Sequence, residues 1–522
     1  MMNKSALIIV FLSFGIAGFS QKDTVALRYS ETITADELRQ HLMILASDKF
    51  EGRETGMAGQ KAASDYIVNY FKGLGVAGCI DGGYQQEFPL RTEKTVSAEM
   101  SVGDKNFSFY EDFYFFPGFN QTELKGSVVF AGYGVESEYY NDYSGLSVKD
   151  KIVVVLNGEP FTSDGFSLVT NEKSPSEWSG DWRIKRDAAE RMGARALVIL
   201  NNDYDQYVGR IKYFLTNPGM KLDMEREERS EVLPTFFVRP EVLDNLVGGK
   251  KVREKMIKSI RKKRVPQSKQ SKNEASISVK RDENKFVSDN VLCFIEGSDP
   301  IIKHEVVVIT AHYDHVGIID GEIYNGADDD GSGTVSVLEI AQAFKKAKDE
   351  GHGPRRSVLL MLVSGEEKGL LGSEWYTMHP IFPLESTVVD LNIDMIGRVD
   401  PEHTDSNYVY LIGSDKLSTE LHDISEKTNA TYTNLDLDYT YNDPKDPNRY
   451  YYRSDHYNFA KNNIPCIFYF SGVHEDYHKP TDTPDKIMYD KTATIARLVF
   501  LTAWDIANRD GKLVVNVQND FK

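Results

Sequence analysis

The sequence has little of three things: cysteine, long apolar runs and positive charge in excess. Its 522 residues include three cysteines, Cys79, Cys293 and Cys466, which lie far apart along the chain. This is too few for a disulfide framework, and none has the close spacing of a zinc-binding C-x-x-C pair. The alternative of one disulfide between two of these cysteines stays open. Any bound metal is therefore expected on histidine and carboxylate side chains.

The charge balance is acidic, with a formal net charge of −18. A general nucleic-acid binder needs positive charge to neutralise phosphates, so this balance argues against one. One basic segment, 250–272, stands out, and we interpret it as a solvated helix and loop. With 41% hydrophobic and 27% charged residues, the composition is that of a folded globular protein. The length predicts two or more domains.

After residue 20, no stretch is apolar enough to suggest a membrane-spanning helix. The first 20 residues differ, because Lys4 precedes an apolar run from Ala6 to Ile16 that ends in small residues up to Ser20. The run is short for a membrane anchor, and the order is typical of a secretory signal peptide cleaved after Ser20. The sequence thus predicts an exported protein, periplasmic or secreted, without stable membrane insertion after cleavage.

Regular elements are expected on both sides of a different middle segment. Thr34 and Glu37 form a capping-box pattern at the start of one helix, and a second helix is expected at about 59–74. From residue 285, apolar strands alternate with helices. Strands are expected at 305–311, 358–363, 387–393, 408–412 and 464–470, and a last helix at about 491–508. This rhythm predicts an α/β domain with a mainly parallel sheet covered on both faces.

Ligands of such sheets bind beyond the carboxyl ends of the strands, and candidate side chains gather there. Six of them end strands or occupy the loops between them: His312, Asp329, Glu366, Glu367, Asp394 and His478. Each one alone is a weak signal. A cluster of buried carboxylates, however, is costly without compensating cations. Nitrogen and oxygen ligands suit Zn²⁺, with Mn²⁺ or Co²⁺ as substitutes.

Several strings in this half of the chain resemble the zinc peptidases of clan MH, family M28. TAHYDHVG, NGADDDGSG, SGEEKGLLGS, NIDMIG and YHKPTDTPDKI follow in the family's order within residues 285–508. Residues 36–116, which include FEGRETG, are similar to the start of family members. The strings GSVVFAGYGV, KDKIVVVLNG and RDAAERMGARALVIL resemble a protease-associated (PA) domain.

The resemblance implies a fold and a division of the chain. The fold is the zinc aminopeptidase/phosphorylase-like one, a mixed, mainly parallel sheet sandwiched by helices, with an inserted mainly-β PA domain. The expected division is a signal peptide at 1–20, the N-terminal part of the peptidase domain at 21–118, the PA-like insert at 119–284, and the metallopeptidase domain with the zinc site at 285–522.

The resemblance also implies two zinc ions per chain. His312 and Asp394 would hold one ion, and Glu367 and His478 the other. Asp329, the second Asp of GADD, would bridge the two ions. A water shared between two such metals has a lowered pKa and can attack a peptide carbonyl.

Three further residues receive roles from the resemblance. Asp314 would accept from the ring N–H of His312 and fix its orientation. Glu366 would act as general base, and Tyr451 would donate to the tetrahedral oxyanion. His315 and His456 are interpreted as structural.

The sequence departs from the family around Tyr451. The best-known secreted members have a disulfide flanking this tyrosine, and the equivalent positions here are Arg449 and Arg453. These two residues and Arg398 either bind a substrate carboxylate or pair with aspartates nearby in the sequence. We expect pairing, which is common on the loops of acidic proteins.

These features predict an exported di-zinc metallo-aminopeptidase that acts on peptides with a free N-terminus and binds no nucleic acid. A carboxypeptidase of the same fold that acts on acidic C-termini is the main alternative, although the sequence ends too soon after His478 for the helical dimerisation domain of those enzymes. Glutaminyl cyclases usually keep one zinc and lack a PA insert. A receptor on this scaffold would have lost metal ligands, and here all five are present. Side-chain preference, the role of the insert and oligomeric state stay open.

Overall fold

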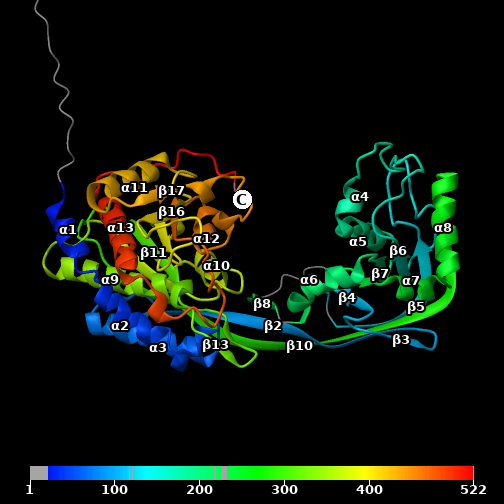
Figure 1. Ribbon diagram of the computed structural model, residues 1–522, viewed down its shortest axis with the longest axis horizontal. Coiled ribbons are helices and arrows are strands. Elements are labelled where there is room, and N and C mark those ends of the chain that lie inside the picture. Colours follow the sequence, from blue (N-terminus) through cyan, green and yellow to red (C-terminus); the bar gives the residue numbers. More distant parts are fainter. Residues whose placement is uncertain (1–21, 117, 120, 217–218, 225–231, 521–522) are drawn as a thin grey trace, which may run out of the picture. The chain divides into compact units, whose positions relative to one another are not determined.

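The computed structural model describes residues 22–116, 118–119, 121–216, 219–224 and 232–520, so the expected signal peptide at 1–20 lies outside the described residues. Two compact units are present (Figure 1). Unit 1 contains the chain up to Pro89 and again from Phe286, whereas unit 2 is the continuous stretch Leu90–Lys285. Two strands, β2 (Gln85–Val102) and β10 (Ser268–Ile295), have residues in both units.

The sheet of unit 1 has the strand order β17-β16-β18-β15-β11-β14-β10, with β1 also paired to β10. The central strands β14, β11, β15 and β18 are parallel, β10 is antiparallel to β14, and β16 is antiparallel to β18 but parallel to β17. This is the predicted mixed, mainly parallel sheet. The bounds are β1 (Ala77–Gly78), β11 (Val306–His312), β14 (Ser357–Val363), β15 (Thr387–Ile393), β16 (Tyr408–Ile412), β17 (Asp436–Asp438) and β18 (Cys466–Phe470).

Helices cover both faces of this sheet. Alternate residues of β11 explain why, since Val307 and Ile309 pack into one apolar core and Val306 and Val308 into another. The first core contains α1 (Thr24–Ser30), α2 (Ala35–Leu45), α3 (Ala58–Leu74), α9 (Gly333–Asp349), α11 (Thr419–Tyr432) and α13 (Tyr489–Asn508). The second contains α10 (Leu371–Met378) and α12 (His456–Ala460).

Shorter elements connect these pieces. The hairpin strands are β12 (Gly317–Ile319) and β13 (Glu322–Tyr324), and the short helical turns are η1 (Asp48–Arg53), η2 (Ala327–Ser332), η3 (Leu384–Ser386), η4 (Thr440–Asn442), η5 (Tyr450–Tyr452) and η6 (Pro484–Lys486).

The predicted start of α2 is confirmed in detail. The Thr34 hydroxyl accepts from the backbone N–H of Glu37 at 3.2 Å and donates to the Glu37 carboxylate at 2.7 Å. The first contact satisfies an N–H that the helix itself leaves unpaired, and the second joins the two side chains. The other two predicted helices, α3 and α13, begin within two residues of their expected positions.

Unit 2 combines strands with helices, and the expectation of an inserted mainly-β PA domain stays a prediction. Its strands β5, β6, β7 and β9 are parallel, and apolar residues of the helices, such as Leu243 and Leu246 of α7, fill its core. The bounds are β3 (Lys105–Ser108), β4 (Phe113–Phe115), β5 (Thr122–Ala131), β6 (Ile152–Val155), β7 (Ala196–Leu200), β8 (Gly219–Leu222), β9 (Thr235–Val238), α4 (Glu177–Gly180), α5 (Trp182–Arg191), α6 (Tyr204–Thr216), α7 (Pro240–Val247) and α8 (Lys250–Lys263).

The boundary of unit 2 also differs from the expected insert. The unit begins at Leu90 and not at residue 119, because β4 pairs with β9 and buries the aromatic side chains of Phe113 and Phe115 in the core of unit 2. The basic segment forms α8 as expected, but the chain then enters β10 instead of a loop. The likeness of this stretch to a PA domain stays a prediction.

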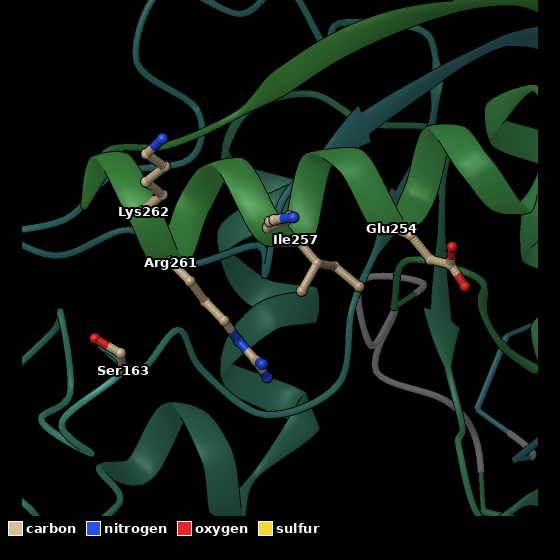
Figure 2. A pocket seen from close by; sticks show the side chains of 6 residues that line it. Ser163, Glu254, Ile257, Arg261 and Lys262 are labelled. Carbon is tan, nitrogen blue, oxygen red and sulfur yellow. The ribbon is translucent and has the colours of Figure 1, made fainter.

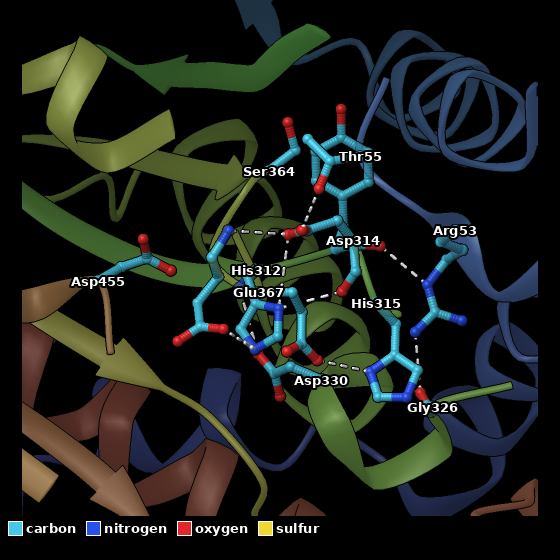
Figure 3. Close-up of polar contacts among 12 residues, drawn as sticks. Arg53, Thr55, His312, Asp314, His315, Gly326, Asp330, Ser364, Glu367 and Asp455 are labelled. Carbon is cyan, nitrogen blue, oxygen red and sulfur yellow. Dashed lines mark hydrogen bonds and ion pairs between the residues drawn. The ribbon is translucent and has the colours of Figure 1, made fainter. Parts of the chain in front are cut away.

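One buried arginine of the FEGRETG string ties the N-terminal segment to loops of unit 1. Arg53, 1% exposed, donates from Nε to the carbonyl oxygen of Tyr313 at 2.8 Å and from Nη1 to those of Leu45 and Asn325 at 2.9 and 2.7 Å. Its Nη2 donates to the carbonyl oxygen of Gly326 at 2.8 Å (Figure 3). The guanidinium fork thus fixes the chain after β11 and after β13.

We expect Arg53→Met to lower the free energy of unfolding by about 3–5 kcal/mol, because four carbonyl oxygens, three of them in buried contacts, lose a charged donor. Denaturant unfolding followed by circular dichroism measures this change. The matched control is Arg28→Met, since the Arg28 side chain is 61% exposed and pairs with Glu350 at the surface. The control is expected to stay within about 0.5 kcal/mol, and an Arg53 variant equally close to the parent would contradict the assignment.

Candidate functional site

The predicted residues meet at the carboxyl edge of the central strands of unit 1. His312 ends β11, Glu366 and Glu367 follow β14, and Asp394 follows β15. Two loops complete the set: Asp329 lies in η2, before α9, and His478 lies between β18 and α13. Because these strands are parallel, their ends deliver the side chains to one place.

The distances divide the cluster into two groups that share one aspartate. His312 Nε2 lies 3.3 Å from Asp329 Oδ1 and 3.6 Å from Asp394 Oδ1. His478 Nε2 lies 3.0 Å from Asp329 Oδ2 and 3.2 Å from Glu367 Oε2. Asp329 therefore presents one oxygen to each group, as a bridging carboxylate would.

The buried atoms of this cluster fit metal ions. Among the described residues, His312 Nε2, Asp329 Oδ2 and Glu367 Oε1 are buried and make no hydrogen bond. Buried polar atoms without hydrogen bonds are costly, and here each lies within 3.3 Å of a histidine or aspartate atom of the same site. Atoms bound to one zinc at tetrahedral angles lie about 3–3.5 Å apart, close to the distances observed. The donor set, imidazole and carboxylate, is one that zinc prefers.

Further residues hold the ligands from behind. His312 Nδ1 lies 3.1 Å from the backbone oxygen of Asp314 and 3.6 Å from its carboxylate. The ring is thus oriented mainly by the carbonyl group of Asp314, whereas the side chain was expected to do this. The carboxylate instead accepts from the Thr55 hydroxyl at 2.6 Å and from Glu366 N at 3.3 Å (Figure 3).

A serine and an asparagine that the sequence analysis did not single out hold the Asp394 side chain in place. The Ser454 hydroxyl donates to Asp394 Oδ2 at 2.7 Å and accepts from Asn392 Nδ2 at 2.8 Å. The signal in the sequence was the string SDH directly after the tyrosine-rich turn. These contacts leave Asp394 Oδ1 facing His312.

The two adjacent glutamates differ in their affinity for a proton. Burial raises the pKa of Glu366 well above its usual value, and the charges of Glu367 and Asp394 raise it further, although His312 opposes them. Burial and Asp329 also act to raise the pKa of Glu367, but His315 and His478 outweigh them and bring it to about 2. Glu367 is thus kept ionised, while Glu366 takes up a proton readily. Such a split is typical of a ligand beside an acid–base group.

His315 is a site residue that the sequence analysis had interpreted as structural. It is fully buried, and its Nδ1 lies 2.9 Å from Glu367 Oε1. The spacing His312-x-x-His315 directly after a strand was the signal available. His456, the other histidine interpreted as structural, lies against the Phe468 ring at a centroid distance of 4.9 Å.

The structure does not bring Tyr451 to this cluster. Its buried side chain bonds to the thiol of Cys466, which begins β18 and so lies at the opposite end of the strand from the site. Tyr450 instead lines the hollow beside Asp329, Glu366 and Asp394. Three consecutive tyrosines on a helical turn point in different directions, and sequence alone did not show which one faces the hollow.

The three arginines do not form the expected pairs with aspartates close in sequence. Arg398 pairs with Asp476 at 3.0 Å, and Arg449 lies over the ring of Tyr452 at 4.6 Å. Arg453 lies over the ring of Tyr450 at 5.0 Å and lines the same hollow as Glu366. Of the three, Arg453 is the one placed to meet a ligand.

A different hollow lies within unit 2, against α8 (Figure 2). It is lined by Ser163, Glu254, Ile257, Lys258, Arg261 and Lys262. This lining is mainly cationic and has no histidine, so it does not resemble the cluster of unit 1. Among the described residues, both groups of side chains that could hold a metal ion lie in unit 1.

Comparison with known proteins agrees with this site. Residues 290–503, which carry all the residues of the cluster, match the model of Peptidase family M28. This segment belongs to peptidase family M28.

Individual relatives resemble parts of the chain. A probable leucine aminopeptidase of Arthroderma otae is 29% identical over 233 residues, which cover 43% of this chain and 59% of that protein. A vacuolar membrane protease of Tuber melanosporum is 33% identical over 107 residues, 20% of this chain and 10% of that protein. The chain thus spans about a tenth of the length of that relative. The aminopeptidase from Aneurinibacillus sp. strain AM-1 has a similar fold, with a TM-score of 0.54, 17% identity, and coverage of 94% of this chain and 98% of that one.

The expectation that the protein is exported, periplasmic or secreted, is wrong on this comparison. Several relatives that match about a fifth of this chain are named vacuolar membrane proteases, a name that refers to the vacuolar membrane. Within the described residues, no helix combines the length and the apolar character needed to cross a bilayer.

Because His456 is buried, we predict that the folded protein loses stability in acid. Burial lowers its pKa from 6.5 to about 3, so between these values the unfolded chain binds a proton there and the folded chain does not. The stability that neutral His456 contributes is complete above pH 6.5 and is lost as the pH falls towards 3. At pH 5 the loss amounts to about 2 kcal/mol.

Thermal unfolding of the parent and of His456→Gln at pH 7.5 and pH 5, both with a chelator present, measures this loss. The chelator keeps metal release out of the comparison. The melting temperature of the parent is expected to fall more between the two pH values than that of the variant. Equal falls for the two proteins would show that His456 contributes nothing to the acid sensitivity.

Proposed function

We propose that this chain is a di-zinc aminopeptidase that removes N-terminal residues from peptides. The observation that carries the proposal is the position of Asp329, which presents one oxygen to His312 and the other to His478. Membership of the M28 segment in its family supports the proposal, as does the likeness to proteins named aminopeptidase.

Two zinc ions would be held by separate ligand groups. His312 and Asp394 would hold one ion, Glu367 and His478 the other, and Asp329 would bridge them. Bound there, the ions would supply an acidic water and polarise the scissile carbonyl group. Mn²⁺ or Co²⁺ would serve as substitutes, since both accept the same ligand types.

Glu366 is the proposed general base. It lines the hollow together with Asp329 and Asp394, and burial raises its pKa, so it is able to take the proton of the attacking water. The same carboxyl group then returns the proton to the leaving amine. The backbone of Asp314 and the hydroxyl of Ser454 keep His312 and Asp394 in place during these steps.

The hollow favours an apolar residue at the N-terminus of the substrate. Met395, Tyr450, Phe468, Phe470 and Val473 line it beside the carboxylates. The apolar side chains would receive the substrate side chain, and the carboxylates of the cluster would attract its free amine. Binding then places the first peptide bond next to Glu366.

A second candidate function rests on Arg453, which lines the same hollow. A guanidinium group there is suited to bind a carboxylate, as in a carboxypeptidase that acts on acidic C-termini. The two functions are separated by substrates. Aminoacyl p-nitroanilides test for the first, and N-blocked peptides with a C-terminal glutamate test for the second.

We expect the purified chain to release p-nitroaniline from apolar aminoacyl substrates, a chelator to stop the release, and zinc to restore it. Glu366→Gln is expected to lower kcat by about 10²–10⁴-fold while two zinc ions stay bound, measured by elemental analysis. The matched control, Glu374→Gln on α10, keeps full activity. Two bound zinc ions without hydrolysis of any free-amine substrate would overturn the aminopeptidase proposal.

Substitutions of Tyr450 and Tyr451 are expected to differ in their effect on kcat/KM. Tyr450 lines the hollow and is the tyrosine proposed to donate to the oxyanion, so Tyr450→Phe is expected to lower kcat/KM by about tenfold or more. Tyr451→Phe is expected to stay within about threefold of the parent, because its hydroxyl contacts Cys466. A large loss of kcat in Tyr451→Phe alone would restore the role that the family resemblance gives to this tyrosine.

A further inference from the structure

Two imidazoles, and not one, face the carboxylate pair Asp329 and Glu367. His478 Nε2 lies 3.0 Å from Asp329 Oδ2 and 3.2 Å from Glu367 Oε2. From the loop after β11, His315 Nδ1 lies 2.9 Å from Glu367 Oε1 and 3.8 Å from Asp329 Oδ2. Figure 3 shows the His315 ring directed at Glu367. The two histidines therefore approach different oxygens of the same glutamate, with ring centroids 5.7 Å apart.

The buried polar atoms around His315 have no hydrogen-bond partner outside the cluster among the described residues. His315 is 0% exposed, and among the described residues neither of its ring nitrogens makes a hydrogen bond. Glu367 Oε1 and Asp329 Oδ2, which face it, are buried and make none either. Buried polar atoms without other partners are costly, whereas a cation shared by the imidazole and the two carboxylates satisfies all three together.

The backbone holds the His315 ring in this position. A Cβ atom on Gly326, whose φ is +54°, would lie 2.5 Å from two carbon atoms of the ring, so glycine permits the close approach. The backbone N–H of His315 donates to the carbonyl oxygen of Arg53 at 3.2 Å. Arg53 in turn bonds to the carbonyl oxygen of Gly326. The ring thus lies between a fixed turn and the carboxylates.

We propose that His315 is a fourth protein ligand of the metal held by Glu367, His478 and Asp329. This inference rests on the proposed di-zinc centre. Four protein ligands fill a tetrahedral zinc shell, whereas His312, Asp394 and Asp329 give the other metal three. The two positions are then unequal: the metal near His315 binds more tightly and is largely closed, and the metal near His312 keeps the open position that a water or substrate needs.

The first test measures zinc affinity, not activity. Chelator competition and elemental analysis are run on the intact parent, on His315→Gln and on the control His456→Gln, which alters a buried histidine outside the cluster. The parent is expected to bind two zinc ions with separable affinities. His315→Gln is expected to weaken the tighter of the two by about 100-fold or more and to leave the other within about threefold. Unchanged affinities in His315→Gln would overturn the proposal.

The second test separates a ligand from a residue that merely positions Glu367. In His315→Cys loaded with Co²⁺, a thiolate-to-cobalt charge-transfer band is expected, because a thiolate at position 315 reaches the same metal. His456→Cys gives no such band. A loss of affinity in His315→Gln without a band in His315→Cys would overturn the ligand assignment.

A measurement on the unaltered chain covers the case in which these variants fail to fold. With one equivalent of zinc bound, X-ray absorption is expected to show two imidazoles on that zinc, and a single imidazole would overturn the inference. Failure of the proposed function looks different. Two zinc ions bound without peptide hydrolysis reject the aminopeptidase and leave the result for His315 intact, whereas hydrolysis with one imidazole at the tight zinc rejects the inference alone.

Discussion

Repulsion among buried carboxylates is the constraint on which the rest of unit 1 depends. Asp329, Glu366, Glu367 and Asp394 converge on a sheet edge where little water reaches them. Burial and mutual repulsion each raise the cost of keeping such groups charged. Three histidines, His312 and His315 at the end of β11 and His478 from a later loop, lie beside them and supply nitrogen atoms that, with the carboxylates, can bind a cation. The arrangement therefore makes sense as a metal centre and would be unfavourable as a simple polar core.

Two further buried carboxylates in the surrounding loops are stabilised by hydrogen bonds from backbone N–H groups. Asp330 accepts from His312 N at 3.2 Å, from Gly333 N at 2.9 Å and from Met395 N at 3.1 Å, so one side chain joins three segments that carry ligands. Asp482 accepts from the N–H of Asp329 in the same way. These carboxylates bind amide groups and so remain outside the metal-binding set. Hydrogen bonds from backbone N–H groups, together with the hydroxyl of Ser454, thus hold the loops and side chains of the ligands in position.

The sequence predicted the parts of this design that depend on periodicity and order. Apolar strands ending in His312, Glu367 and Asp394 showed the parallel sheet and its active edge, because strand ends and ligand types are local properties. It did not show that residues 268–288 form a strand, since their polar and charged composition lacks a strand pattern. Nor did it show which of Tyr450 and Tyr451 faces the hollow, because the direction of a side chain on a short turn depends on tertiary packing. His315 was missed for a related reason: two histidines three residues apart look alike until the distances are known.

The fold also constrains the order in which the chain is able to assemble. Arg53 bonds to carbonyl groups that lie 260, 272 and 273 residues later in the chain, and Arg497 bonds to Ile33 across 464 residues. Unit 2 is one continuous stretch, whereas unit 1 needs both ends of the chain. During synthesis, unit 2 therefore has all its residues available while the N-terminal helices still lack the sheet that covers their apolar faces. The apolar faces of those helices therefore stay uncovered until almost the whole sequence has been made.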